Sequence, residues 1–250
     1  MLRPRTIAAI RSSRAAGIPV LVATGRMYRS VKPYLDLAGI DDPVVCYQGA
    51  AVVDPQDGVF LLHQPLPLDV ARETIAALEE LGYPPNVYVD DELYVAAHTP
   101  YSHAYAEFQH LPVTEVGHLL GWLEAPPTKL VAVGEPDALP AVRETLRARL
   151  GDRAFLTTSL PYLLEIGSPD VSKGSGLAFV ADRLGIERAG IVAFGDGEND
   201  VELLVAAAFG VAVGDAHPRL REAADWECAG PDEEGVAAVI EAYLDVDSDP

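Results

Sequence analysis

The stretch AFGDGENDVE, residues 193–202, places two glycines, two aspartates, two glutamates and an asparagine directly after a short apolar run. The apolar residues 191–194 are typical of a buried strand, and Gly195-Asp196-Gly197 is typical of a tight turn. Apolar residues at 201, 204, 205 and 208 then follow the spacing of one helix face. Asp196 is therefore expected at the carboxyl end of a parallel strand, the edge where open α/β sheets bind ligands.

The same alternation of strands and helices runs through both ends of the 250-residue chain. The patterns predict helices at 4–16, 26–38, 173–184, 199–208 and 233–243, and strands at 18–23, 44–47, 190–194 and 209–213. Such alternation predicts an α/β domain built on a parallel sheet. We assign residues 1–65 and 163–250 to this domain.

Between residues 66 and 162 the pattern changes, and we interpret this segment as an inserted α+β domain. Its pattern predicts a helix at 69–81, short paired strands near 86–90 and 93–96, a further helix, a strand at 129–134, a helix at 136–150 and a strand at 154–159. Asp90 and Asp91 are interpreted as the turn of a hairpin rather than as catalytic residues. A ligand is expected between two such domains.

The charge balance excludes some classes of partner. The chain has 38 Asp and Glu against 18 Lys and Arg, a formal charge of -20. Nucleic acid and anionic membranes are poor partners for such a surface, and a phosphorylated substrate would need local positive charge or a metal ion. No segment approaches the roughly 18 apolar residues of a membrane span. The two distant cysteines suit a reducing compartment such as the cytoplasm.

Three expected helix starts carry groups that suit a phosphate or a metal ion. Asp196 offers an oxygen ligand for Mg²⁺, or it caps the following helix. Thr24 offers a hydroxyl and neighbouring amides to a phosphate oxygen, or it is a helix cap. Lys173 opposes the helix dipole unless an anion lies beside it, or it is a solvated surface lysine. Asn199 and Asp200, in a first helical turn, are placed to orient waters or the ligand.

Five motifs resemble the haloacid dehalogenase superfamily, and in particular its Cof-type phosphatases. They are VATGR (22–26), YQGAAVVD (47–54), SKGSGL (172–177), GDGENDVELL (195–204) and GVAVGDAHPRLREAAD (210–225). The resemblance covers residues 1 to about 243, and its last stretch is highly specific. It implies a Rossmannoid parallel-sheet core with an inserted α+β cap domain. It also implies Mg²⁺-dependent hydrolysis of small phosphomonoesters, such as sugar phosphates.

The resemblance assigns a role to each candidate residue. Thr24 would hold the transferring phosphoryl group, Lys173 would neutralise its charge, and Asp196 would bind Mg²⁺. Asn199 and Asp200 would support the metal or phosphate site. The residues expected to face the substrate are Gly25, Arg26, Gln48 and Gly49, where Gln48 stands at a position that is usually asparagine in the family.

One part of the family pattern is absent from the sequence. The nucleophile of these phosphatases belongs to an Asp-x-Asp-Gly-Thr motif on a strand that precedes the helix beginning here near Pro4. We expect that strand between the strands at 18–23 and 190–194, and its carboxylates upstream of Met1. The 250-residue chain is then expected to be nearly inactive. The alternative is a non-catalytic protein that binds phosphorylated ligands.

Overall fold

The computed structural model describes residues 2–109 and 111–246. These residues form two compact units. Unit 1 comprises 2–24, 31–61 and 172–246, and unit 2 comprises 25–30, 62–109 and 111–171. Unit 2 extends to Val171, beyond the boundary expected after Tyr162. That boundary would fall between two strands that pair with each other, β8 (Phe155–Leu160) and β9 (Leu163–Gly167).

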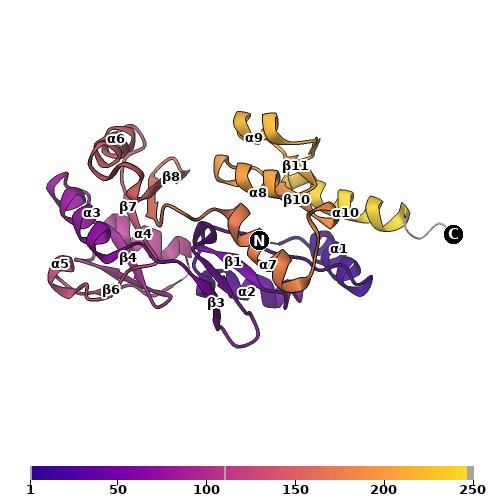
Figure 1. Cartoon of the computed structure of the whole chain (residues 1–250), viewed down its shortest axis with the longest axis horizontal. Helices are drawn as coiled ribbons and strands as arrows, with labels where there is room; N and C mark the ends of the chain where they lie inside the picture. Colours follow the sequence, from indigo (N-terminus) through magenta and orange to yellow (C-terminus); the bar gives the residue numbers. More distant parts are fainter. Residues whose placement is uncertain (1, 110, 247–250) are drawn as a thin grey trace. The chain divides into compact units, whose positions relative to one another are not determined.

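Unit 1 contains two three-stranded sheets (Figure 1). The strands β1 (Val44–Cys46), β2 (Ala51–Val53) and β3 (Phe60–His63) form the first sheet in that order, with β1 and β2 antiparallel. The second sheet is parallel, in the order β10 (Val192–Gly195), β11 (Phe209–Val213) and β12 (Trp226–Cys228). The helices of this unit are α1 (Pro4–Ala15), most of α2 (Tyr28–Ala38), α7 (Lys173–Leu184), α8 (Val201–Ala206), α9 (Pro218–Ala223) and α10 (Gly235–Val246).

The predicted strand at 18–23 is not a regular strand in the structure. The segment is extended, but it pairs with β1 only through one parallel bridge, between Ala23 and Val45. The Val45 amide donates to Val22 O at 2.9 Å, and the Thr24 amide donates to Val45 O at 2.8 Å. The described structure thus shows strand pairing only at the carboxyl end of this segment. The apolar side chains of 20–23 are only half-buried.

Strand β10 is an edge strand of its sheet among the described residues, because it pairs with β11 and with no other strand. Its first residue, Val192, is 44% exposed, and Phe209, which pairs with it on β11, is 41% exposed. The opposite face of the sheet is packed: Ala193 and Ala212 are buried against Leu204 of α8. One face of this short sheet therefore carries the core, and the other leaves large apolar side chains partly uncovered.

Local chemistry explains where the helices of unit 1 start and stop. Ser172 and Ser175 form a capping box at the start of α7, and Gly185 ends the helix in a left-handed conformation. The predicted helix at 199–208 is shorter in the structure. A 3₁₀ turn at Glu198–Asp200 comes first, and α8 ends at Ala206 before the chain enters β11.

Unit 2 is built on a six-stranded sheet in the order β6-β5-β4-β7-β9-β8. Its pairs are antiparallel except for β5 and β6. The remaining strands are β4 (Asn86–Val89), β5 (Glu92–Val95), β6 (Thr114–Glu115) and β7 (Lys129–Val133). The predicted hairpin at 86–96 is confirmed, with Asp90 and Asp91 as its turn.

The two faces of this sheet differ in chemistry. Apolar side chains such as Val87, Leu130 and Leu164 join a core with α3 (Leu68–Glu80), α5 (Leu119–Trp122) and α6 (Leu139–Leu150). The other face of the sheet contacts α4 (Pro100–Gln109). The α4 side carries buried polar groups: Lys129 and Glu165 pair there, and the Tyr88 hydroxyl contacts the Tyr105 hydroxyl of α4 at 2.6 Å.

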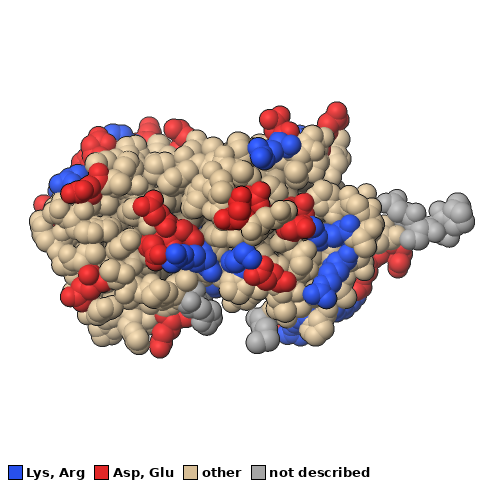
Figure 2. Space-filling view, turned by 90° about the horizontal axis from the view of Figure 1, so that it is seen from below, with Lys and Arg blue, Asp and Glu red and all other residues tan. Residues whose placement is uncertain are grey.

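Basic side chains on the face shown in Figure 2 lie mostly beside acidic ones. Ion pairs join Arg149 to Glu80 in unit 2 and Arg219 to Glu198 in unit 1. Across residues 2–109 and 111–246, no helix combines the length and the apolar character needed to span a bilayer.

Candidate functional site

The Asp200 carboxylate is the centre of the candidate site. Its Oδ1 accepts a hydrogen bond from Lys173 Nζ at 2.5 Å, and its Oδ2 accepts from the backbone amides of Asp196 and Gly197 at 3.1 and 3.0 Å. Lys173 is 7% exposed and Asp200 is 4% exposed. The lysine is therefore not a solvated surface residue. The carboxylate fixes the turn after β10 and at the same time holds a buried positive charge at the start of α7.

Asp196 itself does not cap the helix that follows. Asp200 precedes α8, and Gly197 precedes the 3₁₀ turn, while the Asp196 carboxylate remains exposed at the end of β10. The Asp196 backbone carbonyl accepts from the His217 amide at 2.8 Å, which ties this turn to the start of α9. Of the two roles considered for Asp196, helix capping is therefore excluded. Its side chain extends from a backbone that hydrogen bonds hold in place.

Gln48 links two of the predicted segments. Its backbone amide donates to Thr24 O at 3.0 Å, and its side-chain Oε1 accepts from Asn199 Nδ2 at 2.9 Å. The residue is 4% exposed and has a φ of +61°, so the chain bends sharply to bury this amide. Thr24, Gln48 and Asn199 therefore belong to one hydrogen-bonded chain, and Asn199 is the neighbour of Asp200.

Two glycines allow the segments to approach this closely. Gly49 has a φ of +104°, and a Cβ at this position would lie 1.9 Å from Ser172 O, just before α7. A Cβ at Gly174 would lie 2.2 Å from Glu202 O on α8. Side chains at either position would push the start of α7 away from its neighbours. Seven predicted residues thus share one region of unit 1: Thr24, Gln48, Gly49, Lys173, Asp196, Asn199 and Asp200.

Gly25 and Arg26 group with unit 2 instead. The carbonyl of Gly25 accepts from Lys129 Nζ at 2.8 Å, and Arg26 Nη1 donates to Ser30 Oγ at 3.2 Å.

The oxygen ligands suit Mg²⁺ only with help from the substrate or water. No group of three or more His, Cys, Asp or Glu side chains suited to a metal ion occurs within the part of the chain that the structure describes. Both oxygens of Asp200 already accept hydrogen bonds, which leaves the Asp196 carboxylate as the exposed ligand. Mg²⁺ is commonly held by one or two carboxylates together with waters and substrate phosphate, so this donor set fits the ion.

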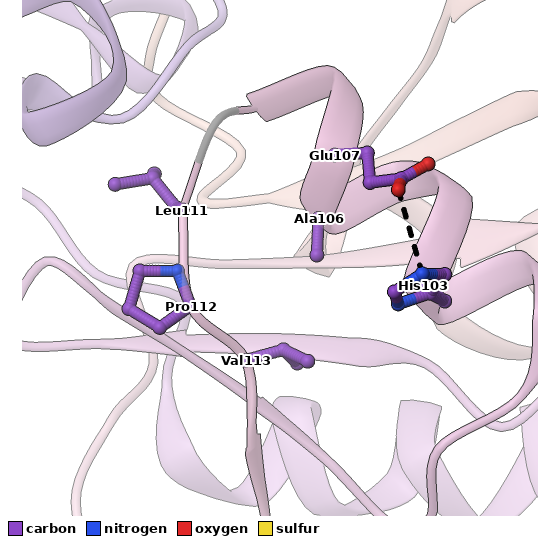
Figure 3. Close-up of a pocket in the computed structure, with 6 residues that line it drawn as sticks. All are labelled: His103, Ala106, Glu107, Leu111, Pro112 and Val113. Carbon is purple, nitrogen blue, oxygen red and sulfur yellow. Dashed lines mark ion pairs between the residues drawn. The ribbon is translucent and has the colours of Figure 1, made fainter.

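A pocket of about 580 Å³ lies elsewhere, in unit 2 (Figure 3). It is lined by residues of α4 and of the segment that follows: His103, Ala106, Glu107, Leu111, Pro112 and Val113. His103 Nε2 and Glu107 Oε1 are 3.5 Å apart at its edge. None of the residues predicted from the sequence lines this pocket.

The family follows from a match that spans nearly the whole chain. The profile of the haloacid dehalogenase-like hydrolases matches residues 1–240. The chain belongs to this family. The mixed α/β fold and the hydrolase class expected from the five motifs are thereby confirmed. Its phosphatase relatives support a phosphoric monoester hydrolase.

Three known proteins show how close this hydrolase is to its relatives. The 5-amino-6-(5-phospho-D-ribitylamino)uracil phosphatase YitU of Bacillus subtilis is 30% identical over 245 residues, covering 96% of this chain and 90% of that protein. The phosphoglycolate phosphatase of Archaeoglobus fulgidus is 28% identical over 233 residues, covering 93% and 86%. The crystal structure of TM0651 from Thermotoga maritima aligns with a TM-score of 0.84 at 28% identity, covering 96% and 90%.

Two polar contacts of this hydrolase were not predicted from its sequence. Lys129 and Glu165 form a buried pair, and the Asp91 carboxylate accepts from the amides of Tyr28 and Arg29. A signal existed for the pair, because each residue is the one charged side chain in an otherwise apolar strand. The role of Asp91 had a weaker signal, which is an aspartate where a tight hairpin turn favours glycine.

Proposed function

We propose that this hydrolase is a Mg²⁺-dependent phosphatase that acts on small phosphomonoesters, such as sugar phosphates, in the cytoplasm. The observation that carries the proposal is the buried Lys173–Asp200 pair beside the exposed Asp196. Phosphoryl transfer depends mainly on positioning and on neutralising the charge of the phosphoryl group. The phosphatase activities of the two relatives, one of them on a phosphoribityl compound, support the same substrate class.

Each residue has a defined task in this proposal. The Thr24 hydroxyl binds a phosphoryl oxygen, and the Lys173 ammonium neutralises the phosphoryl charge from the start of α7. Asp200 keeps that ammonium in place and fixes the turn that carries Asp196. Asp196 would hold Mg²⁺, which supplies further neutralisation of the phosphate oxygens. Gln48 keeps Asn199 in position. Gly25 and Arg26 contact the substrate, and the inserted unit determines which ester is accepted.

The covalent route needs a carboxylate nucleophile. It attacks phosphorus, the ester oxygen leaves with a proton, and water then hydrolyses the aspartyl phosphate. The proposed tasks of Thr24, Lys173 and Asp196 are to bind and neutralise the phosphoryl group, and none of these residues is assigned the role of nucleophile.

A non-catalytic phosphate-binding protein is the second candidate. It is favoured by one observation: the described part of unit 1 supplies a buried ammonium and an exposed carboxylate, but no group of three or more possible metal ligands. Such a protein would use the Lys173 region to hold a phosphorylated ligand and would not transfer its phosphoryl group.

The test measures binding and hydrolysis separately. Binding of inorganic phosphate with Mg²⁺ is measured by calorimetry, and hydrolysis of a panel of sugar phosphates is measured by the release of inorganic phosphate. Lys173→Ala should weaken phosphate binding by about 100-fold, whereas Asp182→Asn, at an exposed position of α7, should not. Hydrolysis that is lost in Lys173→Ala supports the phosphatase. Binding without hydrolysis supports the second candidate, and absence of both binding and hydrolysis refutes both.

A further inference from the structure

The segment that leaves Thr24 is held by three side chains of unit 2. The Asp91 carboxylate accepts from the Tyr28 amide at 3.0 Å through Oδ1 and from the Arg29 amide at 2.9 Å through Oδ2. Lys129 Nζ donates to Gly25 O at 2.8 Å. The third contact is an ion pair of Arg29 with Glu92, the residue after Asp91, at 2.6 Å.

Helix α2 starts in this segment and needs an external cap. The residue before the helix is Met27. Its side chain has no oxygen that could accept a hydrogen bond from the first backbone amides of α2, which have no acceptor within the helix. Pro33 lies inside the helix and lacks the amide that would donate to the carbonyl of Arg29. The first turn of α2 is therefore weak by its own sequence, and Asp91 supplies the acceptors that it lacks.

Asp91 occupies a conformation that favours glycine. Val89 pairs with Glu92, so Asp90 and Asp91 form a two-residue hairpin turn, and their φ values are +53° and +56°. Turns of this kind prefer glycine, commonly in the second position, because both residues adopt positive φ. An aspartate at the second position, buried to 6% exposure, is unfavourable for the turn alone. The two hydrogen bonds from the amides of α2 offset this unfavourable conformation.

We propose that Asp91 is a positioning residue for the phosphate-binding segment. By accepting from the amides of Tyr28 and Arg29, it fixes the backbone of 25–29, the segment of unit 2 that directly follows Thr24 in the chain. Lys129 fixes the same segment at Gly25. This inference rests on the proposed function for its consequence, because a displaced Thr24–Gly25 backbone presents its hydroxyl and amide poorly to a phosphate oxygen. Asp91 itself is not expected to contact the phosphate.

Two glycine substitutions in the turn give a matched test. Asp91→Gly relieves the positive φ but removes the cap, whereas Asp90→Gly relieves the positive φ of its neighbour and leaves the cap intact. Asp91→Asn retains one oxygen and tolerates the turn. Because glycine suits the turn, Asp91→Gly is expected to fold, which far-UV circular dichroism checks. All variants are made in the full 250-residue chain.

The first measurement is amide hydrogen exchange by NMR. Asp91→Gly should speed exchange at Tyr28 and Arg29 by about tenfold, the effect expected from losing a helix cap, and should shift the amide signals of Thr24 and Gly25. Asp90→Gly should change neither. Asp91→Asn should restore protection at one of the two helix amides. Unchanged exchange at Tyr28 and Arg29, or unchanged signals of Thr24 and Gly25 in Asp91→Gly, would overturn the inference.

The second measurement is the affinity for inorganic phosphate with Mg²⁺. Asp91→Gly should weaken binding by about tenfold while Asp90→Gly binds like the native chain. Equal affinities in the two variants would overturn the proposed consequence. If the native chain binds no phosphate, the proposed function fails, whereas the exchange data still decide whether Asp91 positions the segment.

Discussion

Among the described residues, a buried lysine is paired with a carboxylate in each unit. In unit 1, Lys173 and Asp200 are 2.5 Å apart, and in unit 2, Lys129 and Glu165 are 2.7 Å apart. Asp200 lies in a turn at the end of a strand and also accepts from two backbone amides. Lys129 lies within a sheet, where its ammonium also bonds Gly25 O and lies 5.1 Å from the centre of the Tyr88 ring.

The difference shows that burial of a charged pair does not by itself mark a ligand site. The partners of Lys129 include Glu165 and the Gly25 carbonyl, so this pair joins β7 to β9 and to the segment at 25–30. The Lys173 pair lies beside the exposed carboxylate of Asp196, at the ends of strands, where a ligand has access. Substitutions that break each pair test this distinction. The two tryptophans make the units separately visible, because Trp226 lies in unit 1 and Trp122 in unit 2.

The largest effect is expected from Asp200→Ala. The substitution leaves the Lys173 ammonium buried without its carboxylate and frees two backbone amides, so unit 1 should lose about 4 kcal/mol of unfolding free energy. Urea unfolding followed by Trp226 fluorescence, in a Trp122→Phe background, measures the loss. Asp36→Ala removes the partner of Lys32 in a more exposed pair and should cost within about 0.5 kcal/mol. Similar losses in both variants would contradict the central role of Asp200.

Glu165→Ala should destabilise unit 2 by about 3 kcal/mol, at the lower end of the range for breaking a buried pair. The reason for the smaller loss is that Lys129 keeps its hydrogen bond to Gly25 O and its position near the Tyr88 ring. Trp122 fluorescence in a Trp226→Phe background reports the change. A loss in unit 1 alone would show that the pair does not stabilise the sheet of unit 2.

Replacing both members of a pair by apolar residues separates the two cases further. Lys129→Met with Glu165→Leu should change the stability of unit 2 by less than about 1 kcal/mol, because no unpaired charge remains. Lys173→Met with Asp200→Leu should still cost about 2 kcal/mol, since the amides of Asp196 and Gly197 lose their acceptor. Urea unfolding of the two double variants, with the same tryptophan backgrounds, compares them. Equal costs would remove the distinction between the pairs.

The sequence placed both residues of the first pair at one edge of a sheet without predicting that they pair, whereas for the second pair it offered only two isolated charges in apolar strands. Lys173, Asp196 and Asp200 occur at helix starts or turns after apolar runs, so local patterns place them at one edge of a parallel sheet. The pairing of Lys129 with Glu165 depends on the antiparallel register of β7 and β9, in which Val131 faces Glu165. Register between strands that are distant in the chain is set by packing of the whole sheet, which local patterns do not contain.

The same reasoning explains the errors in the predicted fold. The run at 18–23 has the composition of a buried strand, but a strand also needs partners, and only its end pairs with Val45. The short strand β12 was missed because WEC lacks the apolar run by which the other strands were identified. The hairpin turn at Asp91 was predictable because it depends on neighbouring residues. The hydrogen bonds from Asp91 to the amides of Tyr28 and Arg29 join residues 62 or more positions apart, so local patterns could not predict them.

The smallest effect concerns the pH dependence of unit 2. Burial of part of the ring lowers the pKa of His63, and the nearby charge of Asp90 opposes this shift. His63 therefore takes up its proton at a lower pH in the folded state than in the unfolded state, where a histidine has a pKa of about 6.5. Stability from this group is present above that pH and is lost as the pH falls below it.

Urea unfolding followed by Trp122 fluorescence, in the Trp226→Phe background, should show that the free energy of unfolding declines from pH 7.5 to about 5.5. The decline should be weaker in His63→Gln. The same substitution at His98, another exposed histidine of unit 2, is the control. An equal decline in His63→Gln and the parent chain would show that His63, whose Nε2 lies 3.0 Å from Thr128 Oγ1, does not link proton binding to the stability of unit 2.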